Sequence, residues 1–193
     1  MSTLSSGSMQ QNPQPKPWSK SQIIAVAIGG ALLIVSLVAG YRFAASHTTA
    51  GPIPGEIQRK LTFSPFVLSR DAKNFQVSEV RFSTAEGQVN VLSFKITSKN
   101  SPAITLSQYP QPEQFSDIPE YKERFLSNVA KQYATVQTAG GTIYLGHMTR
   151  QNNQQLGILL EKGLLVFMSP AKDVDQATWR QLGDQLEIQK ITH

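Results

Sequence analysis

Residues 156–169 read LGILLEKGLLVFMS and form the most apolar part of the chain beyond its first 60 residues. Two apolar runs, 156–162 and 164–169, meet at a turn around Lys162 and Gly163, which predicts two neighbouring strands. Strands that are buried on both faces have nearly continuous apolar sequences. We therefore expect this pair to lie in the centre of a β-sheet, with the other strands arranged around it.

Two β-prone runs earlier in the chain predict a hairpin. Residues 75–83 read FQVSEVRFS and residues 89–97 read VNVLSFKIT, with a turn at 85–87 between them. Every second residue of the later run is apolar, so one face of this strand is expected to be buried and the other solvated. The buried face would carry Leu92, Phe94 and Ile96.

Further strands are expected on both sides of a helix. The run AITLSQY at 103–109 follows a short turn, GTIYLGHM at 141–148 precedes the central pair, and 135–138 predict a short strand. Between them, Asp117 and Glu120 have the spacing of a capping box for a helix that runs to about Tyr133. Its buried stripe would consist of Ile118, Tyr121, Phe125, Val129 and Tyr133.

A second helix closes the chain. Asp173 or Asp175 can cap it, and its buried stripe would consist of Trp179, Leu182 and Leu186. The order of elements is strands, helix, strands, helix, with short connections. This order favours an α+β fold with a mainly antiparallel sheet and two helices packed on it, rather than a parallel sheet.

The N-terminal part contains a long apolar segment. Residues 23–39 read IIAVAIGGALLIVSLVA, without a charge and with Ser36 as the one polar side chain. The segment 22–43 would be about 33 Å long as a helix, close to the hydrocarbon thickness of a bilayer. Trp18 and Tyr41 flank it, as aromatic residues do at membrane interfaces. A buried core helix would be amphipathic, so we expect 22–43 to be a transmembrane helix in contact with the lipid bilayer.

The membrane segment divides the chain into regions. Residues 1–21 are polar and proline-rich, which predicts a disordered tail, and 44–60 are rich in small residues, which predicts a flexible linker. Residues 61–193 form the α+β domain. Lys16 and Lys20 precede the helix, so we expect the N-terminus in the cytoplasm and the C-terminal domain outside the cell membrane.

A cleaved signal peptide is the alternative to a retained anchor, because Ala44, Ala45 and Ser46 form a candidate processing site. Two observations favour the anchor. The apolar run is longer than the roughly 7–15 residues of a signal-peptide core, and Arg42 lies between that run and the cleavage site.

Charge and composition exclude several classes of function. The net charge is +5, but Lys16, Lys20 and Arg42 lie in the first 43 residues, where there is no acidic residue. The rest of the chain has 15 basic and 13 acidic side chains in a scattered arrangement, so no nucleic-acid-binding face is expected. The chain contains no cysteine, which rules out disulfides, thiolate metal sites and a lipid-modified cysteine anchor.

No catalytic, cofactor-binding or metal-binding residues are identified in the sequence. His147 is the one histidine in an expected strand, and no further His, Asp or Glu accompanies it at metal-ligand spacing. No G-x-S-x-G elbow and no phosphate-binding glycine loop is present. The loop 149–155, TRQNNQQ, is a solvated connection in which Arg150 and Asn152 offer polar contacts to a partner.

The arrangement resembles small bacterial membrane-anchored proteins with an extracytoplasmic α+β domain of unknown function. The features that carry the resemblance are the segment 22–43, Ile104-Thr105-Leu106-Ser107-Gln108 before a helix, GTIYLG at 141–146 and a terminal helix with Trp179. The resemblance implies location and shape, without catalytic residues.

We therefore expect a single-pass envelope protein with a non-catalytic binding or scaffolding domain and an envelope protein as partner. One alternative is an envelope hydrolase, in which His147 would cluster with a serine and an acidic residue in a cleft. Another is a structural subunit of a secretion or pilus assembly. The small-residue spacing of Ala25 and Gly29 would permit a weak homodimer through the membrane helix.

Overall fold

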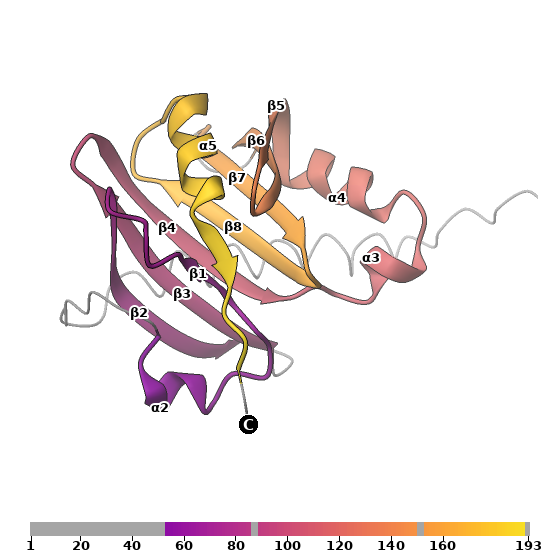
Figure 1. Cartoon of the computed structure of the whole chain (residues 1–193). Coiled ribbons are helices and arrows are strands. Elements are labelled where there is room, and N and C mark those ends of the chain that lie inside the picture. The colour runs from indigo at the N-terminus through magenta and orange to yellow at the C-terminus, as the bar shows by residue number, and fades with distance from the viewer. Residues whose placement is uncertain (1–52, 86–88, 150–152, 192–193) are drawn as a thin grey trace, which may run out of the picture. The chain divides into compact units, whose positions relative to one another are not determined.

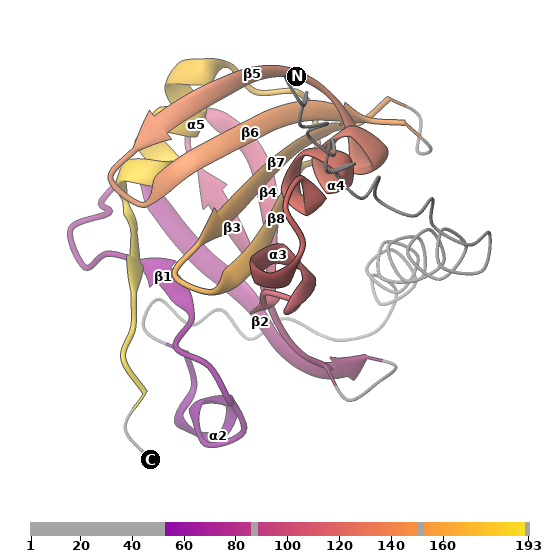
Figure 2. The ribbon, with the colours of Figure 1, turned by 90° about the vertical axis from the view of Figure 1, so that its right-hand side faces the viewer.

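The computed structural model describes residues 53–85, 89–149 and 153–191. They form an α+β fold with an antiparallel sheet of seven strands and a separate two-stranded ribbon (Figure 1, Figure 2). The sheet order is β2-β3-β4-β8-β7-β6-β5. The strands of the sheet are β2 (Phe75–Ala85), β3 (Val89–Ser98), β4 (Ser101–Pro110), β5 (Ala130–Thr138), β6 (Gly141–Met148), β7 (Gln155–Glu161) and β8 (Leu164–Pro170). The ribbon pairs β1 (Phe66–Leu68) with β9 (Leu186–Ile188), and the helices are α2 (Gly55–Gln58), α3 (Gln114–Asp117), α4 (Tyr121–Val129) and α5 (Gln176–Asp184).

The apolar run of 156–169 forms the middle of the sheet, as predicted. Strand β8 is the fourth of the seven strands and pairs with β4 on one side and β7 on the other. The β7–β8 hairpin closes at the pair Glu161 and Leu164, so Lys162 and Gly163 form a two-residue turn. Both have positive φ, 54° and 72°, which is the conformation of a type I′ turn and matches the twist of the strands.

The sheet is covered on both faces. Neighbouring residues of a strand point to opposite faces, so Val166 and Phe167 on β8 belong to different layers. Val166 lies in the main core together with Trp179 of α5. The ring of Phe167 lies 6.2 Å from that of Phe125 on α4. Helices α5 and α4 therefore cover opposite faces, and the main core lies on the α5 side.

Trp179 lies at the centre of the contact between α5 and the sheet. It is fully buried in the main core. The space for its indole ring exists because β7 has a glycine at this point. A Cβ on Gly157 would lie 2.8 Å from Trp179 Cζ3. Asp175 caps the helix by accepting a hydrogen bond from the backbone N–H of Thr178 at 2.7 Å, as expected for one of the two candidate caps.

The expected helix from Asp117 to Tyr133 is wrong in both its start and its end. A short helix, α3, ends at Asp117, and Ile118 is extended (φ −116°, ψ 109°) because it precedes Pro119, which disfavours the helical conformation. Helix α4 then starts at Tyr121 after Glu120, which has a φ of 65° and makes no side-chain cap. The capping box is therefore absent. The chain turns extended at Ala130, so Tyr133 lies in the edge strand β5 and not in a helical stripe.

Two further element boundaries differ from those that the sequence predicts. Residues 53–60, the end of the expected linker 44–60, include α2, and Ile53 is buried in the main core. Leu186 follows α5 in β9 and not within the helix, and it is nevertheless buried.

The predicted transmembrane segment 22–43 and the tail 1–21 lie outside the described residues. Over 53–85, 89–149 and 153–191, the structure has no helix that is both long and apolar enough to span a bilayer.

Candidate binding pocket

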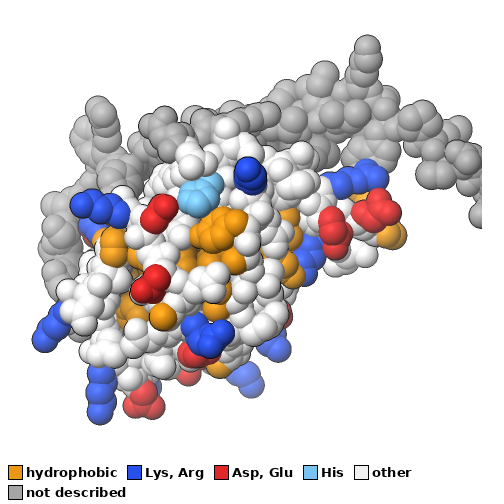
Figure 3. All heavy atoms as spheres, turned by 90° about the horizontal axis from the view of Figure 1, so that it is seen from above, with side chains coloured by type: hydrophobic (Ala, Val, Ile, Leu, Met, Phe, Trp, Pro, Cys, Tyr) orange, Lys and Arg blue, Asp and Glu red, His pale blue; other side chains and the backbone are white. Residues whose placement is uncertain are grey.

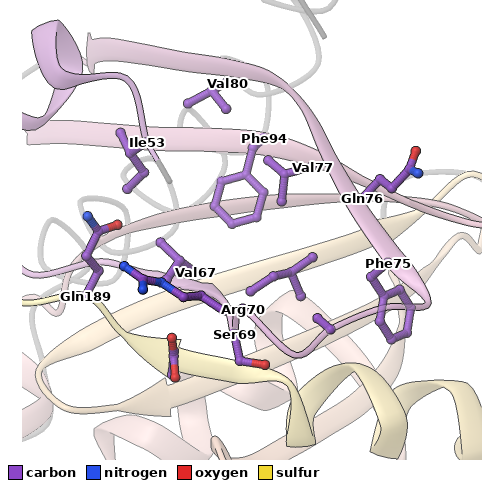
Figure 4. A pocket seen from close by; sticks show the side chains of 13 residues that line it. Ile53, Val67, Ser69, Arg70, Phe75, Gln76, Val77, Val80, Phe94 and Gln189 are labelled. Carbon is purple, nitrogen blue, oxygen red and sulfur yellow. The ribbon is translucent and has the colours of Figure 1, made fainter. Parts of the chain in front are cut away.

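A pocket of about 460 Å³ lies between the edge of the sheet at β2 and β3 and the β1–β9 ribbon (Figure 4). Most of its lining is apolar, and a few polar side chains stand among the apolar ones. Such a combination is typical of small-molecule sites. The lining consists of Ile53, Val67, Leu68, Ser69, Arg70, Ala72, Phe75, Gln76, Val77, Val80, Phe94, Glu187 and Gln189.

One wall of the pocket depends on a buried glutamine. Gln108 on β4 is fully buried, donates to the carbonyl of Phe66 at 2.8 Å and accepts from its N–H at 2.7 Å. These two bonds attach β1 to the sheet, over which it lies in Figure 1. Strand β9 then pairs with β1, and the backbone N–H of Ser69 donates to Gln185 at 2.8 Å. The ribbon is thus held at a fixed distance from the sheet, with the pocket beside it.

The opposite wall depends on a β-bulge in β2. The register between β2 and β3 shifts between Ser78 and Arg81, and Glu79 in the bulge has a φ of 52°. Residues three apart in a regular strand point to opposite faces, but a bulge adds a residue and reverses this alternation. As a result Val77 and Val80 both line the pocket, together with Phe94 of β3.

Two ion pairs hold the bulge. The carboxylate of Glu79 lies 3.1 Å from Lys95 Nζ and 3.5 Å from Arg81 Nη2. All three side chains are partly exposed, so each pair contributes little energy.

The polar groups of the pocket are Arg70, Glu187 and Gln189, with Ser69 and Gln76. Arg70 is exposed and has no ion-pair or hydrogen-bond partner within the described part of the chain. Ser69 Oγ is occupied, since it donates to Gln185 Oε1 at 3.0 Å. The Oε1 atom of Gln189 is buried and has no hydrogen-bond partner among residues 53–85, 89–149 and 153–191. A buried acceptor without a donor is costly, so this atom is a candidate for a hydrogen bond to a bound ligand.

The structure places His147 away from this pocket. Its Nε2 lies 3.3 Å from Asp173 Oδ2, and its ring stacks on Tyr133 with centroids 4.9 Å apart. The Tyr133 hydroxyl accepts from Gln155 Nε2 at 2.6 Å, and the same amide is bound to the backbone of Val174. Figure 3 looks onto this face, with the histidine in pale blue.

This cluster has a structural explanation. Gln155 is buried and forms a two-bond link with Val174, which anchors the segment that leads into α5. The Asp173 side chain is 65% exposed and pairs with His147 at the surface. No serine is among the residues recorded in contact with His147, and the histidine lines neither of the two pockets described here. Of the serine, histidine and acidic residue expected of a hydrolase, the described residues therefore bring together only His147 and Asp173.

Other candidate features are weaker. A second, more open hollow of about 610 Å³ lies between α4, β5 and β6, where Lys122 Nζ sits 4.7 Å above the ring of Tyr144. Within the described ranges, no group of three or more His, Asp or Glu side chains is arranged to hold a metal ion. Arg150 and Asn152 of the polar loop lie outside the described residues.

The sequence does not predict the pocket because one of its walls comes from two short strands that are distant in the chain. Strands β1 and β9 have three residues each, too few to show a period. The sequences Phe66-Val67-Leu68 and Leu186-Glu187-Ile188 are apolar enough to be strands, but nothing local indicates that they pair across the length of the domain.

Neither family models, curated proteins nor solved structures provide a match to this chain.

Proposed function

We propose that the protein is a single-pass membrane-anchored envelope protein whose C-terminal domain is a non-catalytic binding module. The observation that supports binding is the pocket between the β-bulge of β2 and the β1–β9 ribbon. It combines an apolar wall with a cation, Arg70, and a buried acceptor on Gln189, neither of which has a partner in the part of the chain that the structure describes. Pockets with few and well-placed polar groups are the usual form of ligand sites.

The chemistry of the lining supports binding over catalysis. Ser69 is the one hydroxyl side chain of the lining, and it is bonded to Gln185, not to a base. A nucleophile needs a neighbouring base within hydrogen-bonding distance. His147, the one histidine of the described residues, belongs to the separate cluster with Asp173.

The proposed anchor is the segment 22–43, which is uncharged over 23–39 and flanked by aromatic and basic residues. With Lys16 and Lys20 retained in the cytoplasm, the domain that begins at Ile53 would lie outside, within about ten residues of the membrane helix.

Membrane fractionation of cells that produce the full chain tests the anchor. We expect the protein to stay in the membrane pellet after alkaline carbonate treatment and to dissolve only in detergent. Leu33→Arg puts a charge at the centre of the segment and should release part of the protein, whereas Leu4→Arg in the tail should not.

Protease treatment of spheroplasts tests orientation and processing. An epitope tag before Lys16 should survive while residues beyond 51 are digested. Recovery of a shortened, carbonate-soluble protein that starts near Ser46 would show a cleaved signal peptide instead. A protein that is soluble at full length would contradict the proposal.

A further inference from the structure

We propose that the pocket binds a single-chain amphiphile whose head carries one anionic group next to an N–H or O–H donor. This inference rests on the proposed binding function and names the class of ligand. Three features of the pocket carry it: the size and apolarity of the wall, the unpaired guanidinium of Arg70, and the buried unpaired oxygen of Gln189.

The apolar wall is the reason for proposing a hydrocarbon chain in the ligand. Eight of the 13 lining residues are apolar, and Val77, Val80 and Phe94 present their side chains to the same space. A volume of about 460 Å³ lies within the range of about 300–1,000 Å³ of small-ligand sites. Burial of methylene groups against such a wall removes apolar surface from water and so stabilises the complex. A hydrocarbon tail is therefore the part of the ligand that the wall selects.

Arg70 is the reason for proposing an anionic group in the head of the ligand. Its side chain lines the pocket and is exposed, without a carboxylate partner among the described residues. In the view of Figure 4, Arg70 and Gln189 lie at one end of the pocket, whereas Phe75 and Gln76 lie at the other. A guanidinium holds a carboxylate or phosphate oxygen through charge-assisted hydrogen bonds. The head of the amphiphile is thus placed at the Arg70 end and its chain toward Val77 and Phe94.

Gln189 is the reason for proposing a hydrogen-bond donor in the head of the ligand. The Oε1 atom is buried without a partner among the described residues, so a ligand N–H or O–H beside it would supply the missing hydrogen bond. Glu187 lies two residues away on the ribbon and also lines the pocket. Its carboxylate repels additional negative charge but tolerates a donor, so a head with one negative charge and an N–H or O–H fits better than a multiply charged head.

Two matched probes separate these contributions. N-decanoylglycine carries a hydrocarbon chain, an amide N–H and a carboxylate, whereas N-decanoylsarcosine has a methyl group in place of that N–H. Binding is measured by isothermal titration calorimetry on the full chain in phosphatidylcholine nanodiscs, with empty nanodiscs as the baseline. We expect saturable binding of N-decanoylglycine and about tenfold weaker binding of N-decanoylsarcosine.

Variants assign the effects to residues. Arg70→Gln should weaken both probes about tenfold, and Lys73→Gln, an exposed cation nearby that does not line the pocket, should weaken neither. Gln189→Leu removes the unpaired acceptor, so it should bind the two probes equally. Thermal melting of each variant verifies folding, and Gln189→Leu should melt no lower than the original protein because the Oε1 atom that it removes has no partner among the described residues.

The outcomes distinguish this inference from the proposed function. Absence of binding above the baseline, or equal binding to the Arg70→Gln and Lys73→Gln variants, overturns the ligand class while an anchored external domain still stands. Equal binding of both probes to the original protein overturns the role of Gln189. A soluble full-length chain overturns the proposed function whatever the probes do.

Discussion

Gln108 on β4 and Phe66 on β1 are joined by two hydrogen bonds between a side-chain amide and a backbone peptide, at 2.7 and 2.8 Å. The glutamine therefore does for β1 what a neighbouring strand would do, because it satisfies both the N–H and the carbonyl of one residue. Gln155 makes the same two-bond link with Val174, at 2.9 and 3.0 Å. Both glutamines are buried, so the segments before β2 and before α5 are each fastened to the sheet by an amide in a dry environment.

Replacement of Gln108 tests this link. Gln108→Leu leaves the N–H and the carbonyl of Phe66 unpaired in the core, which should lower the free energy of unfolding by about 2–4 kcal/mol. Urea denaturation measures the loss. Hydrogen exchange at the Phe66 amide should accelerate more than exchange in β7 and β8, because β1 is released first.

A matched glutamine serves as the control for this experiment. Gln114 is exposed on α3 and makes no recorded side-chain hydrogen bond, so Gln114→Leu should change stability by less than about 0.5 kcal/mol. Equal effects of the two substitutions would show that the amide of Gln108 does not hold the ribbon.

Gly157 sets the distance between β7 and α5. Its absent side chain leaves room for the indole of Trp179, whose Cζ3 would lie 2.8 Å from an added Cβ. Gly157→Ala should therefore destabilise the domain by about 1–3 kcal/mol through overpacking. Gly55→Ala in α2 meets nothing within 4 Å and should be neutral, as measured by thermal denaturation of both variants.

The turn at Lys162 offers a stabilising substitution. Lysine has a φ of 54° here, in the left-handed region that costs most residues about 1–2 kcal/mol. Asparagine followed by Gly163 is the preferred pair for a type I′ turn. Lys162→Asn should thus raise the free energy of unfolding by about 0.5–1 kcal/mol. Lys172→Asn, at an exposed residue without positive φ, should leave stability unchanged in the same urea titration.

Tyr109 makes the domain sensitive to alkali. Burial, and to a lesser degree the neighbouring Tyr121, raises the pKa of Tyr109 well above its ordinary value of 10.0. The unfolded chain therefore releases this proton before the folded one. We therefore expect the contribution of Tyr109 to stability to be complete below about pH 10 and to fall above it, by up to about 1.4 kcal/mol per pH unit.

Urea titrations between about pH 9 and 12 check this dependence. Tyr109→Phe should flatten the decline above pH 10 and leave the result at pH 9 nearly unchanged, since no hydrogen bond of the Tyr109 hydroxyl is recorded among the described residues. Burial also raises the pKa of Tyr121, so part of the slope should remain. An unaltered slope in Tyr109→Phe would contradict the assignment.

The strands were predictable from the sequence where they are long. Apolar alternation in 89–97 located β3 and its buried face, and GTIYLGHM coincides with β6. The nearly continuous apolar run of 156–169 correctly indicated the centre of the sheet. These signals are local, because they depend only on which side chains avoid water at a spacing of two residues.

The errors occurred where a local pattern met a competing constraint. The helical spacing from Ile118 to Tyr133 suggested one helix, but Pro119 interrupts its start. The last expected turn is not helical, because its residues belong to β5 and pair with β6. A strand with a bulge can also place apolar residues at three- and four-residue steps, because the bulge reverses which face the following side chains point to. Strand β5 has such an irregularity, since its register with β6 shifts between Gln132 and Ala134.

The chain by itself determined an antiparallel α+β domain with a central apolar hairpin, since periodicity and turn residues act between near neighbours. Only the tertiary structure decided the pocket. Its walls join Ile53, the bulge at Glu79 and the ribbon of β1 with β9, which lie far apart in sequence. Their meeting depends on strand register and on the buried amide of Gln108, and neither leaves a repeating pattern in the order of the amino acids.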